Sequence, residues 1–190
     1  MEKETQKTEV KAWLKNLPNK LTFFRIAVIP FICVLYPWDY RVFNLLCAAI
    51  FAVGALTDFF DGYLARKLNS VSKIGEILDP ISDKLLVGAA LVVMVGGGVL
   101  SSWIAVLILS RETAVSGLRL AAAEQGFSVK VSNLGKIKTL LQDLSITLLL
   151  TREPDIETIG MMILWLSVGF SYVSAYEYWT KFWERNRDQF

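Results

Sequence analysis

Six long apolar stretches constrain this chain more than any other feature of its sequence. Most of them approach the ~20 residues that a helix needs to cross a hydrocarbon core about 30 Å thick. Helices of that length satisfy their own backbone hydrogen bonds, whereas the strands of a membrane barrel would be about ten residues long and would alternate in polarity. The sequence therefore predicts an all-α integral membrane fold with six transmembrane helices, at 21–38, 41–64, 77–97, 102–124, 137–151 and 157–180.

The composition supports the same class. Hydrophobic residues make up 54% of the 190-residue chain and charged residues 20%, and the mean hydropathy is +0.44. A soluble domain of this size carries about 25% charged residues and could not bury so much apolar surface. Intrinsic disorder is excluded by the same values.

The lysines and arginines predict how the helices are oriented. Fifteen of the 20 lie on the N-terminal tail, near the second and fourth connections between helices, or at the C-terminus, whereas only Arg41 and Arg152 lie on the opposite connections. Because cytoplasmic connections carry the excess of positive residues, we expect both termini to face the cytoplasm.

The first twenty residues lack the apolar core of a cleavable signal peptide. Between Val10 and Leu17 apolar residues recur at i, i+3, i+4 and i+7, with lysines among them. This pattern predicts a short amphipathic helix that lies on an anionic membrane surface, with an unstructured tail as the alternative. We expect one membrane domain over 1–190, of which 1–20 are this interfacial segment.

The chain contains no histidine, and its two cysteines lie in apolar runs without the spacing of a disulfide framework or a zinc site. Carboxylates are therefore the remaining acid–base and metal-binding groups. Four aspartates lie in or beside the second and third apolar stretches, where a charge costs about 2.5–3.5 kcal/mol on insertion scales. They are Asp58, Asp61, Asp79 and Asp83.

At 100° per residue, Asp58 and Asp61 share one helix face, and Asp79 and Asp83 share a face of the next helix. Four carboxylates this close repel one another unless cations bind among them. Oxygen ligands alone select Mg²⁺ or Mn²⁺, and two such ions form a clamp used for displacement at phosphorus. The alternative is that the aspartates are helix-end carboxylates paired with nearby lysines, namely Lys67, Lys73 and Lys84.

Small and basic residues accompany the aspartates at regular spacing. The pattern D-x-x-D-G-x-x-A-R, followed after eight residues by G-x-x-x-D-x-x-x-D, resembles the signature of the CDP-alcohol phosphatidyltransferase family. Its fixed positions are Asp58, Asp61, Gly62, Ala65, Arg66, Gly75, Asp79 and Asp83.

The resemblance implies transfer of a phosphatidyl group from CDP-diacylglycerol to an alcohol, with release of CMP. It implies that the four aspartates hold two divalent cations, Mg²⁺ or Mn²⁺, and that Asp83 is the catalytic base. It also implies a homodimer in a bacterial cell membrane, with the active site facing the cytoplasm and no nucleic-acid partner. The residues expected to bind CDP-diacylglycerol are Thr22, Arg25, Asp58, Asp61, Gly62, Ala65, Arg66, Ser72 and Gly75.

Three flanking segments, which begin at Leu17, Arg111 and Gly135, are similar to segments of bacterial members of this family whose acceptor is glycerol 3-phosphate. Concentrated positive charge suits the dianion glycerol 3-phosphate better than a neutral alcohol. The alternative is that Arg119, Lys136 and Lys138 are only the positive residues that flank helices on the cytoplasmic side. Arg111 would then pair with Glu112 or Asp143. The residues expected to bind glycerol 3-phosphate are Arg111, Arg119, Lys136 and Lys138.

Three other functions stay open on the sequence alone. Another member of the family, such as a cardiolipin, phosphatidylinositol-phosphate or phosphatidylserine synthase, would use a different acceptor. A divalent-cation transporter would need polar residues that continue to the far side, and no such ladder is present. A membrane scaffold without activity would need neither the paired aspartates nor Arg66 beside them.

Overall fold

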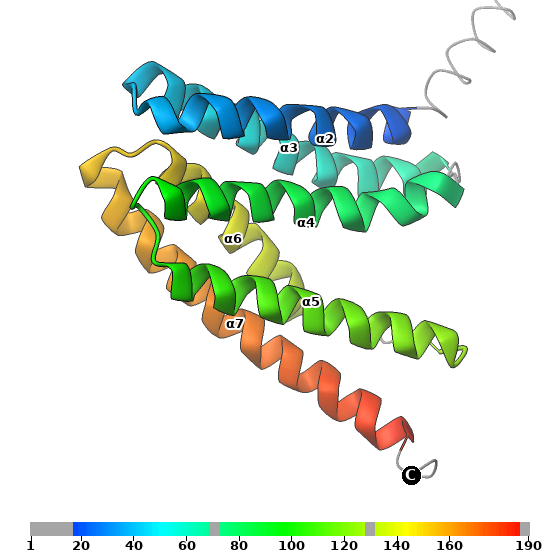
Figure 1. Ribbon diagram of the computed structural model, residues 1–190. Helices are drawn as coiled ribbons and strands as arrows, with labels where there is room; N and C mark the ends of the chain where they lie inside the picture. The colour runs from blue at the N-terminus through cyan, green and yellow to red at the C-terminus, as the bar shows by residue number, and fades with distance from the viewer. Residues whose placement is uncertain (1–16, 69–72, 128–131, 187–190) are drawn as a thin grey trace, which may run out of the picture. The chain divides into compact units, whose positions relative to one another are not determined.

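The computed structural model describes residues 17–68, 73–127 and 132–186, with side chains for 22–57, 78, 81–127 and 132–185. Within those ranges all regular structure is helical, so the prediction of an all-α fold is confirmed (Figure 1). The elements are α2 (Leu17–Leu35), the 3-10 turn η1 (Tyr36–Trp38), α3 (Arg41–Leu68), α4 (Lys73–Gly96), α5 (Ser102–Glu124), α6 (Asn133–Leu150) and α7 (Pro154–Asn186).

Each of the six predicted stretches coincides with one of the described α-helices, and α5 has the predicted bounds. Helix α2 begins at Leu17, inside the expected interfacial segment, and the rest of that segment lies outside the described residues. Helix α6 begins four residues before the predicted 137, because the side chain of Ser132 caps it by accepting a hydrogen bond from the Gly135 amide at 3.2 Å.

Helix ends follow local sequence signals. Helix α4 ends at Gly96, and Gly98 then adopts a φ of +76°, a left-handed conformation that a glycine reaches without strain. Helix α7 begins with Pro154, and its first turn carries Asp155 and Glu157, whose charges suit the positive end of a helix dipole.

The chain divides into two compact units, with the boundary between Val93 and Met94. In the first unit α2, α3 and α4 run alongside one another (Figure 1). The three helices meet at Gly54 of α3, because a Cβ built on it would lie 2.8 Å from Leu86 of α4 and 3.8 Å from the Arg25 side chain of α2. The missing side chain at Gly54 therefore lets three helices meet.

In the second unit α6 packs along α7, and a Cβ on Gly160 of α7 would lie 3.0 Å from the Leu149 side chain. The face that α7 buries carries serines at i, i+4 and i+7, and the buried face of α6 carries polar residues at the same spacing. These buried polar residues are Ser167, Ser171 and Ser174 on α7, and Lys138, Gln142 and Ser145 on α6.

Among the described residues, one helix is long and apolar enough to cross a membrane by length and composition, Pro154–Arg185 within α7. Two shorter apolar segments are Thr22–Trp38 and Arg41–Thr57. Helices α4 and α5 carry ionisable residues in their middle turns, which lower their average hydropathy. The prediction of six membrane-crossing helices therefore stays a prediction.

Gly54→Leu is expected to destabilise the fold by about 1–3 kcal/mol, since a buried site without room forces neighbours off their preferred rotamers. Leu86, which the new side chain would meet, is itself only 1% exposed. Thermal unfolding of the purified protein measures the loss. The matched control is Gly117→Leu on α5, where an added Cβ would meet no side chain within 4 Å among those that the structure describes. Equal melting temperatures for the two variants would contradict close packing at Gly54.

Candidate functional site

The aspartate motif lies on the two helices that the sequence predicted. Helix α3 is continuous through positions 58–66, and α4 is continuous through 75–83, so the 100° spacing behind the predicted faces applies to both backbones. Of the motif side chains, only that of Asp83 is described, and it is half-buried. No group of three or more potential ligand side chains is found among the side chains that the structure describes. The motif side chains outside that description are Asp58, Asp61, Gly62, Ala65, Arg66, Gly75 and Asp79, and Ser72 lies outside it entirely.

The contact between α3 and α4 shows which positions of the two helices lie side by side. Gly54 lies fourteen residues before the end of α3, and its contact Leu86 lies thirteen residues after the start of α4, which is the register of an antiparallel helix pair. Continuing this register along the two helices puts position 58 level with 82 and position 61 level with 79. The two halves of the motif therefore occupy the same level of the helix pair.

Helix α2 contributes the two predicted residues Thr22 and Arg25, which are 1% and 0% exposed. Arg25 Nη1 donates a hydrogen bond to Ser82 Oγ of α4 at 3.3 Å. Ser82 precedes Asp83 and is itself fully buried, so Arg25 ties α2 to the turn of α4 that carries the predicted base. Ser82 was not among the site residues predicted from the sequence. Its position next to Asp83, inside the aspartate motif, was the signal that could have identified it.

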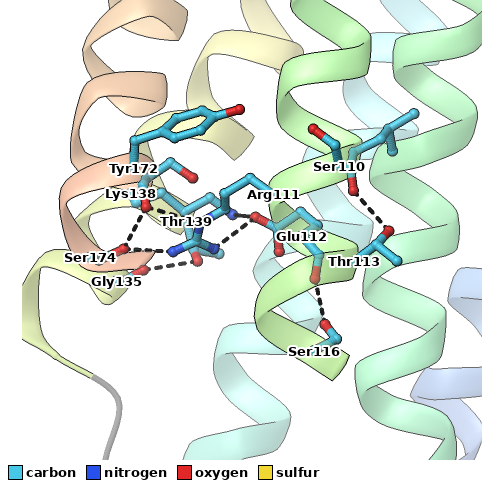
Figure 2. Close-up of polar contacts among 12 residues, drawn as sticks. Ser110, Arg111, Glu112, Thr113, Ser116, Gly135, Lys138, Thr139, Tyr172 and Ser174 are labelled. Atoms are coloured by element: carbon cyan, nitrogen blue, oxygen red, sulfur yellow. Dashed lines mark hydrogen bonds and ion pairs between the residues drawn. The ribbon is translucent and has the colours of Figure 1, made fainter. Parts of the chain in front are cut away.

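A second cluster joins α5 to α6 and α7, as Figure 2 shows. The Glu112 carboxylate accepts a hydrogen bond from Arg111 Nη1 at 3.1 Å, and the same oxygen accepts one from Lys138 Nζ of α6. The side chains of Arg111 and Lys138 are 8% and 5% exposed. Of the two partners that the sequence offered for Arg111, Glu112 is therefore confirmed.

Arg111 also reaches across to α7. Its Nε donates to the backbone carbonyl of Ser171 at 2.9 Å, and its Nη2 donates to Ser174 Oγ at 2.6 Å. All three nitrogens of the guanidinium are thus engaged, which fixes its plane (Figure 2). Sequence reasoning placed no site residue on α7. The spacing of Ser167, Ser171 and Ser174 along one face was the signal that could have found them.

The other two predicted acceptor residues lie apart from this network. The Arg119 guanidinium stands 5.7 Å from the centre of the Tyr178 ring of α7, a cation–π distance. Lys136, in the first turn of α6, is exposed. Of the four predicted cations, the structure brings Arg111 and Lys138 together through Glu112 and leaves Arg119 and Lys136 outside that contact.

Chemically, the second cluster is a fixed cation centre. Two positive groups share one carboxylate, so they retain a net charge of about +1 at neutral pH. Within the described part of the chain, the contacts above engage three of the five N–H donors of Arg111 and one of the three of Lys138. Both side chains therefore have further donors to offer an anion. A phosphate group matches this combination of charge and donors.

Comparison with known proteins connects both clusters to one family. The sequence profile of the CDP-alcohol phosphatidyltransferase family matches residues 15–173. A relative from Bacillus subtilis named CDP-diacylglycerol–glycerol-3-phosphate 3-phosphatidyltransferase is 42% identical, over 89% of this chain and 96% of its own length. Relatives with the same name from Rickettsia typhi and Pectobacterium atrosepticum are 39% and 40% identical, over 87% and 86% of this chain and 96% and 92% of theirs.

Proposed function

The chain belongs to the CDP-alcohol phosphatidyltransferase family, and from that premise we propose that it transfers the phosphatidyl group of CDP-diacylglycerol to sn-glycerol 3-phosphate. The acceptor hydroxyl gives up its proton and forms a bond to the phosphatidyl phosphorus. The bond from that phosphorus to the CMP oxygen breaks, so phosphatidylglycerophosphate and CMP are the products.

One observation carries this proposal. The Bacillus subtilis relative, named for this reaction, aligns over 89% of the chain. Because at most about a tenth of the chain lies outside that alignment, residues 22–169 are inside it whichever end is left out. Both the aspartate motif and the Arg111–Glu112–Lys138 cluster fall in that interval.

The aspartate motif supports binding of two divalent cations, Mg²⁺ or Mn²⁺. The donors are carboxylate oxygens, which these hard cations prefer. The register of α3 and α4 brings their positions to one level of the helix pair, so a shared site fits the backbone. When bound, the cations would offset the negative charge of the diphosphate. We propose as their ligands Asp58, Asp61, Asp79 and Asp83, with Asp58 and Asp79 between the two ions.

The chain's own residues then divide the remaining work. Asp83 accepts the proton of the acceptor hydroxyl, since it is the last carboxylate of the motif and lies beside the anchored Ser82. Arg66 pairs with the diphosphate, because a guanidinium matches phosphate oxygens in a bidentate manner. The remaining residues proposed to line the CDP-diacylglycerol site are Thr22, Arg25, Gly62, Ala65, Ser72 and Gly75.

The acceptor is assigned from charge. Glycerol 3-phosphate carries a phosphate, and the buried cations Arg111 and Lys138 keep a net positive charge beside Glu112. A neutral acceptor such as inositol would leave that charge uncompensated in a buried place, which is costly. Arg119 and Lys136 add positive charge on the same two helices.

The same proposal places the protein in a membrane. Its donor substrate is a lipid, and α7 is apolar and long enough to cross a bilayer. We propose six crossing helices in a single domain, both termini and the active site on the cytoplasmic side, and a homodimer in the bacterial cell membrane. The excess of lysine and arginine on one set of connections supports that orientation.

The purified protein in lipid–detergent micelles tests the proposal through CMP release from CDP-diacylglycerol. Release is expected with glycerol 3-phosphate and not without it, and chromatography of the lipid product is expected to show phosphatidylglycerophosphate. Serine, inositol 1-phosphate and phosphatidylglycerol serve as alternative acceptors. Faster release with any of them would overturn the assigned acceptor. Metal flux into proteoliposomes without CMP release would instead indicate a transporter.

Arg119→Gln and Lys138→Gln are each expected to raise KM for glycerol 3-phosphate about ten- to a hundredfold, because a charge-assisted bond to phosphate contributes roughly 1.5–3 kcal/mol. The KM for CDP-diacylglycerol should move much less, and steady-state kinetics measures both. The control is Lys181→Gln, an exposed lysine of α7. If Lys181→Gln raised KM as much as Lys138→Gln, Arg119 and Lys138 would only be positive residues that flank the helices on the cytoplasmic side, and they would not bind the acceptor.

A further inference from the structure

We propose that Glu112 and Ser174 are positioning residues of the acceptor site, which hold the cations of Lys138 and Arg111 in place for the acceptor phosphate. The inference rests on the proposed function and deepens it. Neither residue belongs to the aspartate motif, and the acceptor residues inferred from the sequence did not include them.

Glu112 has the geometry of a shared anchor. One of its oxygens accepts from Arg111 on α5 and from Lys138 on α6, and its side chain is 19% exposed while those of both partners are below 9%. A lysine side chain loses rotamer freedom when it is immobilised. Because Glu112 holds Lys138 before the acceptor arrives, the acceptor does not have to supply that ordering.

Ser174 holds the other cation. Its hydroxyl accepts from Arg111 Nη2 at 2.6 Å and donates to the Ser171 carbonyl at 2.9 Å, and that same carbonyl accepts from Arg111 Nε. The guanidinium is therefore clamped to one turn of α7 by two of its nitrogens. Ser174 is 5% exposed, so its hydroxyl acts within the protein interior (Figure 2).

Charge repulsion predicts the opposite sign for Glu112. If the carboxylate only repelled the acceptor phosphate, removing its charge would lower KM for glycerol 3-phosphate. Positioning predicts that KM rises, because Lys138 and Arg111 lose the anchor that orders them both. The two readings are thus separated by the direction of one kinetic constant.

The experiment measures KM for glycerol 3-phosphate, KM for CDP-diacylglycerol and kcat in Glu112→Gln and Ser174→Ala, in the full-length protein. Glu112→Gln is expected to raise KM for glycerol 3-phosphate about tenfold or more, as expected when a charged hydrogen bond is weakened. Ser174→Ala is expected to raise it about three- to tenfold. In both variants KM for CDP-diacylglycerol should change by less than about twofold.

Two matched controls keep the result specific. Glu124→Gln removes an exposed glutamate of the same helix, and Ser110→Ala removes an exposed serine whose hydroxyl donates to the Leu107 carbonyl of its own helix. Both should behave as the unmodified protein. Glu112→Asp, which keeps the carboxylate, should recover part of the lost affinity for glycerol 3-phosphate.

The outcomes separate the two proposals. If the unmodified protein releases no CMP in the presence of glycerol 3-phosphate, the proposed function fails. If it does, and Glu112→Gln lowers KM for glycerol 3-phosphate or leaves it unchanged, the positioning role fails alone. A fall in melting temperature with equal changes in both KM values would show that the cluster is only structural, and it would also overturn the inference.

Discussion

Asp58→Ala and Asp79→Ala are expected to release no CMP above background, at any concentration of Mg²⁺ or Mn²⁺. We propose that the two cations would share both residues as ligands, so each substitution would remove a ligand from both ions. The loss is expected to exceed that of a single general base, which typically contributes 10²–10⁴ in rate. The measurement is CMP release from CDP-diacylglycerol by the purified variants over a titration of each metal.

The matched control for these variants is Asp155→Ala, an exposed aspartate in the first turn of α7. Its charge stabilises a helix N-terminus by about 0.3–1 kcal/mol, so activity should persist. Excess chelator should abolish activity of the unmodified protein, and Mg²⁺ or Mn²⁺ should restore it. Full activity in chelator would refute the two-metal proposal.

Asp83→Asn is expected to lower kcat by about 10²–10⁴ while CDP-diacylglycerol still binds. An amide has the shape of the carboxylate but cannot accept the hydroxyl proton, and the loss of one metal ligand adds to the effect. Steady-state kinetics gives kcat, and retention of labelled CDP-diacylglycerol gives binding. A nearly normal kcat in Asp83→Asn would contradict its assignment as the base.

Ser82→Ala distinguishes the base from its support. Arg25 Nη1 donates to Ser82 Oγ, which is next to Asp83 on α4. Removing the hydroxyl leaves the Asp83 carboxylate present, so a loss well below that of Asp83→Asn is expected. If Ser82→Ala lowered kcat as much as Asp83→Asn does, the effect of Asp83→Asn would come from disruption of α4 and not from the removal of a base.

Much of the fold could be predicted because apolar periodicity and helix-end signals are local. The stretch 102–124 matches α5 to the residue, and α4 ends at Gly96, one residue before the predicted end at 97. The start of α6 was missed because Leu134 is the one large apolar residue in its first four, while the Ser132 cap extends the helix to Asn133. Hydropathy detects apolar turns, and it does not detect a polar turn that a cap stabilises.

The candidate site divides in the same way. The family and the spacing of the aspartates along α3 and α4 could be predicted from the sequence, because residues three or four apart on a helix share a face wherever that helix is placed. The sequence did not decide between Glu112 and Asp143 as the partner of Arg111, since both are carboxylates and the choice depends on how the helices pack.

The sequence by itself determined the helical class, the helix positions and the aspartate motif, since each depends on residues close together in the chain. Only the tertiary structure decided that Lys138 and Arg111 share Glu112, that Ser174 of α7 clamps Arg111, and that Arg25 reaches Ser82. Arg111 and Glu112 are adjacent in the chain, but the other three contacts join residues 26, 57 and 63 positions apart. They depend on which helix faces pack together, and a missing side chain such as that of Gly54 sets that packing without any local signal of its own.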